Sequence, residues 1–179
     1  MSEVDNLALL ADYNRWMNQR LYALAGELDD TALQADRGAF FGSVFGTLSH
    51  LAVADTIWMR RYATHPAGQP LAALLDEPAP TSLDARPWPD LPALRARREW
   101  LDGLIMDWVA TLTPQALDRP LAYRNVKGEA AHRRLGSLLV HFFNHQTHHR
   151  GQLTTLLSQM GMDAGVTDLL VRISDEPER

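Results

Sequence analysis

The sequence contains no cysteine and only one lysine, Lys127. A chain without cysteine forms no disulfide and offers no thiolate to a metal ion, so any metal site must use His, Asp or Glu side chains. The absence of cysteine also fits a reducing compartment.

Long apolar runs and a basic leader are missing as well. No stretch of about 18 apolar residues exists, so the sequence predicts no transmembrane helix. The first residues, Met-Ser-Glu-Val-Asp, are acidic and do not begin a secretory signal. The formal net charge of −5 argues against nucleic acid as the main partner. We therefore expect a cytoplasmic protein that binds neither membranes nor nucleic acid.

The composition is that of an ordinary globular domain. The 179 residues are 46% hydrophobic and 22% charged, which predicts a single domain over residues 1–179 with a core of its own. Apolar residues recur at helical spacing in four segments, at about 5–28, 42–62, 91–112 and 130–160. With no convincing strand, this pattern predicts an all-α four-helix bundle.

The connection between the second and third helices, residues 63–90, is unusually long and contains six prolines. A long crossover lets consecutive helices run parallel instead of antiparallel, and it can also cover an active site. After the third helix, residues 121–128 predict a small hairpin or an ordered loop, with Gly128 in its turn.

The second helix, 42–62, is apolar on most of its faces, which predicts contacts with a partner or a loop as well as with its own bundle. We expect a symmetric homodimer. Asp55 falls on an apolar side and needs a buried partner. His50 is surrounded by small residues, which either let another helix come close or leave a cavity: Ser43, Gly46, Thr47 and Ala54.

Four of the seven histidines fall between His141 and His149. Two histidines at i and i+4 on a helix can share one metal ion. At about 100° per residue from His141, the apolar stripe of 135–160 centres at about 110°, His149 lies at about 80° and His145 at about 40°. His145 and His149 should therefore face the core, whereas His141 and His148 face outward or flank a cleft. The alternative is a pair of hydrogen-bonded core histidines.

Basic residues cluster near the start of the third helix, at Arg95, Arg97 and Arg98. We interpret them as a solvated face, with recognition of an anionic substrate as the alternative. On the last helix, Arg150 lies beside the apolar stripe and could pair with Asp55.

Gly151 stands mid-helix, where glycine costs about 1 kcal/mol relative to alanine. Close packing against a neighbouring element is the explanation we favour for it.

Two segments stand out together. The first is Phe-Gly-Thr-Leu-Ser-His50-Leu followed by Asp55 and Trp58; the second is Asn144-His-Gln-Thr-His-His-Arg-Gly-Gln152. Together they resemble the signature of the DinB family, within the DinB/YfiT-like metalloenzyme superfamily. The resemblance runs from the first helix to Gly161. It implies an up-down-down-up bundle, a homodimer, and one divalent metal ion.

The resemblance implies three histidine ligands, namely His50, His145 and His149. The remaining histidines, His65, His132, His141 and His148, are then not ligands. Three protein ligands leave a coordination position open, as in catalytic sites. Imidazole suits zinc, nickel, copper and iron alike, and we favour zinc or nickel.

Relatives in this family include thiol-dependent transferases and isomerases, and others described as hydrolases. We therefore expect a metal-dependent transferase or hydrolase acting on a small molecule, with a low-molecular-weight thiol as a candidate cofactor. The sequence shows no obvious nucleophile or general base beside the three histidines. The alternative is a stress-associated metal-binding protein without turnover.

Overall fold

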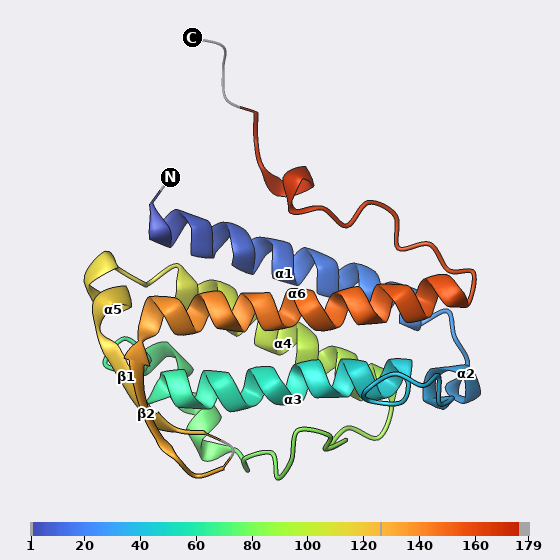
Figure 1. The fold of residues 1–179 in the computed structure, drawn as a ribbon, viewed down its shortest axis with the longest axis horizontal. Coiled ribbons are helices and arrows are strands. Elements are labelled where there is room, and N and C mark those ends of the chain that lie inside the picture. Colours follow the sequence, from blue (N-terminus) through green and yellow to red (C-terminus); the bar gives the residue numbers. More distant parts are fainter. Residues whose placement is uncertain (1, 126, 176–179) are drawn as a thin grey trace.

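The computed structural model describes residues 2–125 and 127–175. Four long helices lie side by side, namely α1 (Glu3–Ala25), α3 (Val44–Ala63), α4 (Leu91–Val109) and α6 (Leu135–Gln159) (Figure 1). Shorter helices connect or follow them, namely α2 (Asp30–Gln34), η1 (Gln69–Asp76), α5 (Pro114–Asp118) and η2 (Leu169–Arg172). A hairpin of β1 (Pro120–Arg124) and β2 (Ala130–Arg134) precedes α6. In the described residues no helix is both long and apolar enough to cross a membrane.

The order of the helices is up-down-down-up, as predicted. In Figure 1, α1 and α6 run in one direction, and α3 and α4 both run in the other. The chain therefore returns along the whole length of α3 before α4 begins, through η1 and the proline-rich segment 77–90. Each long helix packs against two others: α1 lies against α4 and α6, and α3 lies against the same two helices.

Side-chain caps set where three of the four long helices begin, namely α1, α3 and α4. Ser2 accepts a hydrogen bond from the Asp5 amide, and the Asp5 carboxylate accepts one from the Ser2 amide, which completes a capping box. Ser43 caps α3 and Asp90 caps α4 in the same way, each through a hydrogen bond from the amide three residues on.

The start of the last helix differs from the prediction. Residues 130–134, which we expected to be helical, form β2 and pair antiparallel with β1, with Leu121 opposite Arg133. The inter-strand hydrogen bonds outweigh the helical preference of the alanines and arginines in this segment. The predicted hairpin is present, and Gly128 in its turn has φ +80°, the conformation that glycine adopts without strain.

The apolar faces of α3 are covered within the single chain. Most of its residues are buried, because α4, α6 and η1 surround it. The sequence predicted that a partner or a loop would contact α3 outside its own bundle, and the crossover is that loop. The homodimer stays a prediction. Because α3 has no exposed apolar face, this prediction now rests on the family resemblance alone.

A buried polar network joins all four long helices. Arg98 on α4 forms ion pairs with Asp55 on α3, at 2.6 Å, and with Asp102, at 3.0 Å. Asn18 on α1 donates a 2.9 Å hydrogen bond to Asp102. From α6, Gln146 donates to Asp55. All of these side chains are at most 3% exposed.

Asp55 thus has the buried partner that it needs, but that partner is Arg98. Arg150, the residue we expected, is also buried and donates to Asn14 on α1 instead. Burial raises the pKa of the Asp55 carboxyl to about 6 against the attraction of Arg98, so the carboxyl is ionised at neutral pH. Two aspartates and two arginines then balance each other's charge inside the bundle.

Replacing Arg98 with Met should destabilise the fold by about 3–5 kcal/mol, because Asp55 and Asp102 would remain buried without their cation. Arg95→Met on the same helix is the matched control, since Arg95 pairs with Glu99 at the surface, and its cost should stay below about 1 kcal/mol. Urea denaturation followed by circular dichroism measures both. Equal losses would contradict the structural role of the network.

Candidate metal centre

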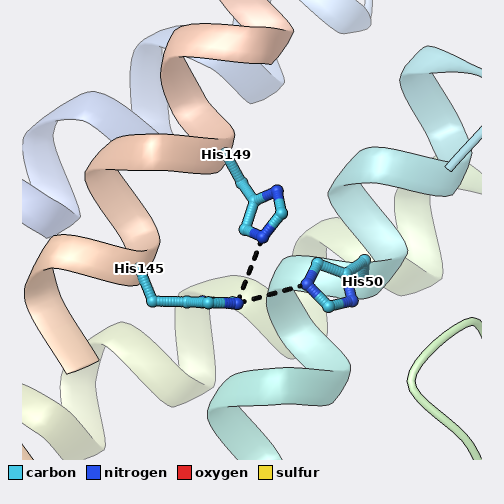
Figure 2. A group of neighbouring side chains, drawn as sticks. All are labelled: His50, His145 and His149. Atoms are coloured by element: carbon cyan, nitrogen blue, oxygen red, sulfur yellow. Dashed lines mark hydrogen bonds between the residues drawn. The ribbon is translucent and has the colours of Figure 1, made fainter. Parts of the chain in front are cut away.

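Three imidazoles meet between α3 and α6 (Figure 2). His50 comes from α3, and His145 and His149 come from successive turns of α6. The Nε2 atom of His145 lies 3.4 Å from that of His50 and 3.1 Å from that of His149. The structure therefore brings together the three histidines that the sequence singled out.

Hydrogen bonds at Nδ1 hold two of the three imidazole rings in place. His50 Nδ1 lies 2.8 Å from the carbonyl oxygen of Leu83 in the crossover, and His149 Nδ1 lies 2.8 Å from Oε1 of Gln152. Because a carbonyl oxygen only accepts, Nδ1 carries the hydrogen in each ring, and Nε2 keeps its lone pair. Bonds of this kind orient metal-binding histidines in proteins.

The three rings are neutral at physiological pH. Burial is the main cause in each: it lowers the pKa of His50 to about 4, that of His145 to about 3, and that of His149 below its ordinary value. The neighbouring imidazoles lower the pKa of His145 further. Neutral imidazole is the form that binds metal ions, so no proton has to leave the site at neutral pH.

The spacing of the nitrogens fits one metal ion. With metal–nitrogen bonds of about 2.0–2.1 Å, two nitrogens on one ion lie about 3.0 Å apart at a right angle and about 3.4 Å apart at the tetrahedral angle. The separations of 3.1 and 3.4 Å fall within this range. These two separations fit a shared divalent ion, and the ligand atoms of the three histidines all lie within 4.8 Å of one another.

A loop before α3 closes one side of the histidine cluster. The ring of Phe41 stacks on His50, with centroids 3.7 Å apart and planes 15° from parallel. Gly46 permits this approach, since a Cβ there would lie only 2.1 Å from the Phe41 carbonyl oxygen. Of the two alternatives for the small residues around His50, the cavity is present, because Ala54 lines it, whereas Gly46 admits a loop and not a helix.

The cavity has a volume of about 240 Å³ and reaches the histidine cluster. His50 and His145 form part of its wall, together with Trp58, Tyr123 and His141. A small molecule in the cavity can therefore reach two of the three imidazoles, those of His50 and His145.

Comparison with known proteins identifies the family. The DinB family model matches residues 1–179. The chain belongs to the DinB family. Protein DinB from Bacillus subtilis (strain 168) is 26% identical to it over 159 residues, which are 89% of this chain and 88% of that protein.

A solved structure shows the same fold. YfiT from Bacillus subtilis, described as a probable metal-dependent hydrolase with an unusual four-helix bundle topology, aligns with a TM-score of 0.61 and 17% sequence identity. The alignment covers 91% of each chain. At this identity the likeness supports the up-down-down-up bundle of this DinB family member and nothing finer.

The remaining histidines are not members of the cluster, although the ring of His148 lies 4.8 Å from that of His149 and the ring of His141 lies 6.1 Å from that of His145. His141 and His148 are exposed, as the helix phase predicted, and His141 flanks the cavity. His65 is buried at the end of α3, where its Nδ1 accepts from the Ala67 amide. His132 lies on the hairpin. Across residues 2–125 and 127–175, one group of His, Asp or Glu side chains is spaced for a metal ion, and it consists of His50, His145 and His149.

The arginines of α4 do not form one basic face. Arg95 pairs with Glu99 at the surface, Arg97 pairs with Glu77, and Arg98 lies in the core. The prediction that these arginines form a solvated face is therefore wrong for Arg98. None of the three arginines lines the cavity. Arg97 and Arg98 are adjacent on the helix and therefore point about 100° apart.

Arg61 is a cavity residue that the sequence reasoning missed. It follows His50 by eleven residues, which is about 20° past three full turns, so the two residues share one face of α3. Helix phase alone could have found it.

Gly151 contradicts the close-packing explanation. It is exposed, and a Cβ built on it meets no atom of the described chain within 4 Å. Nothing in the structure explains why glycine stands there.

The metal-free protein should lose stability as the pH falls from about 6.5 towards 4. In this window the unfolded chain takes up protons on His50 and His145, whereas in the folded chain their depressed pKa values of about 4 and about 3 delay protonation. Urea denaturation at a series of pH values, with a chelator present, measures the slope. The double variant His50→Gln/His145→Gln should show a shallower slope, and an unchanged slope would refute the assignment.

Proposed function

We propose that this DinB family member is a metal-dependent enzyme whose single divalent ion, zinc or nickel, is bound by His50, His145 and His149. The observation that carries the proposal is the convergence of three neutral imidazoles, two of which, those of His50 and His145, line the wall of a cavity. A purely structural histidine cluster needs no such opening. The description of YfiT as a probable metal-dependent hydrolase supports the same class of function.

The chemistry we propose is hydrolysis or thiol-dependent group transfer on a small molecule. A divalent ion with an open coordination position lowers the pKa of a water or a thiol and polarises a carbonyl group. The chain's own residues orient the site: Leu83 and Gln152 fix two imidazoles, and Phe41 covers one side. A low-molecular-weight thiol is the candidate cofactor.

His141 is the side chain placed to accept a proton in this cavity. It lines the wall with His50 and His145, and its ring packs edge-on against Trp58 at 5.2 Å between centroids. Burial, with smaller effects from Arg133 and Arg61, lowers the pKa of His141, so the imidazole is neutral at pH 7 and can act as a base.

The competing proposal is a stress-associated metal-binding protein without turnover, which would need the three histidines but not the cavity. For either function we propose a homodimer in the cytoplasm. Both remain predictions.

Replacing His50, His145 or His149 with Ala should each abolish binding of one equivalent of zinc, because two imidazoles hold a divalent ion much more weakly than three. His141→Ala and His148→Ala are the matched controls on α6 and should retain the ion. Metal analysis after gel filtration gives the content of each variant. Loss of metal in His148→Ala with retention in His149→Ala would refute this ligand set.

Cobalt-loaded protein should change its visible spectrum when a low-molecular-weight thiol is added, and the change should disappear in His50→Ala. An open position on a cation with three neutral ligands favours an anionic thiolate. A spectrum that ignores thiols but shifts with pH near neutrality would favour the hydrolase. A spectrum that responds to neither would favour the protein without turnover.

A further inference from the structure

A second, larger cavity continues from the one at the histidine cluster. Its volume is about 630 Å³, and it lies between α3, the crossover and the hairpin. Four residues line both cavities, namely Ile57, Arg61, Leu83 and Tyr123. Together the two cavities form one cleft, which leads from His50 and His145 past Arg61 towards the hairpin.

Arg61 is the cation at the junction of the two cavities. Its guanidinium lies 4.7 Å from the ring centroid of Trp58 and 5.2 Å from that of Tyr123, so both rings hold it in place. Within the described residues no carboxylate lies within salt-bridge distance of it, unlike the three arginines of α4. The side chain is partly buried, which strengthens its attraction for an anion.

The other arginines of the cleft are already engaged. Arg60 donates to the carbonyl oxygens of Leu74 and Glu77 and thereby holds the crossover. Arg124 donates to the carbonyl oxygen of Gly128 within the hairpin. Arg61 is therefore the guanidinium of the cleft for which the described chain supplies no acceptor.

The charge of the cleft is opposite to that of the whole chain. No Asp or Glu is among the described residues that line either cavity, whereas three arginines are. The chain as a whole carries a formal charge of −5. A cleft with one sign of charge attracts ligands of the other sign.

The reach of Arg61 fits a ligand that extends to the histidine cluster. His50 and Arg61 are about 16 Å apart along the axis of α3, and helical side chains lean towards the N-terminus, which brings the guanidinium back towards His50. A guanidinium pairs well with a planar carboxylate. A single unpaired cation also matches one negative charge better than the two of a phosphate.

We propose that the cleft binds an elongated small molecule with a terminal carboxylate, which Arg61 holds while the reacting end lies at the histidine cluster. The inference rests on the proposed metal-dependent function and names the substrate class of that site. It also separates the roles of two neighbours: Arg60 supports the fold, and Arg61 selects the ligand.

Two hydroxamates of equal chain length test this inference on cobalt-loaded protein. Octanohydroxamate and the monohydroxamate of suberic acid both bind divalent ions through the hydroxamate, but only the second carries a terminal carboxylate. Titrations followed by the cobalt spectrum should give a dissociation constant about ten-fold or more lower for the second, as for a charge-assisted hydrogen bond. Arg61→Gln should remove the difference, and Arg61→Lys should retain part of it.

Arg124→Gln is the matched control, because it removes the same charge from the larger cavity alone. Equal affinities in the unaltered protein, or an equal effect of Arg124→Gln and Arg61→Gln, would overturn the role of Arg61 and leave the metal centre standing. Failure of both hydroxamates to change the spectrum would overturn the proposed function itself. The comparison of the two probes on the unaltered protein tests the inference without any variant.

Discussion

The buried ion pairs of Arg98 constrain the whole bundle. Charged groups persist in a protein core only when each has a partner, so Asp55, Asp102 and Arg98 must meet in one arrangement. That requirement fixes how α3 and α4 are rotated, and Asn18 and Gln146 extend it to α1 and α6.

The same buried polar network also sets the direction in which the metal-site histidines of α6 point. Gln146 follows His145 and Arg150 follows His149 in the sequence, and both of these neighbours are tied to other helices inside the bundle. Adjacent residues on a helix point about 100° apart. Because Gln146 and Arg150 are anchored towards the centre of the bundle, the histidines that precede them point towards α3. The crossover adds the last element, because the carbonyl of Leu83 holds the ring of His50.

Local periodicity predicts part of this arrangement and fails where distant segments meet. The helix phase placed His145 and His149 inward and His141 and His148 outward, because phase depends only on spacing within one helix. His50 came from the family resemblance alone. The partner of Asp55 could not be read from sequence, since Arg98 lies 43 residues away on another helix whose rotation is set by the finished core. The prediction of a helix at 130–134 was wrong for the same reason, because pairing with β1 decides the conformation of this segment.

The all-imidazole composition of the centre also has a chemical consequence. A site built on cysteine thiolates loses its ligands when they oxidise to disulfides or sulfenic acids. His50, His145 and His149 have no such chemistry, and the chain contains no cysteine that could form a competing adduct nearby. The centre is therefore chemically suited to oxidising conditions that would dismantle a thiolate site of the same size.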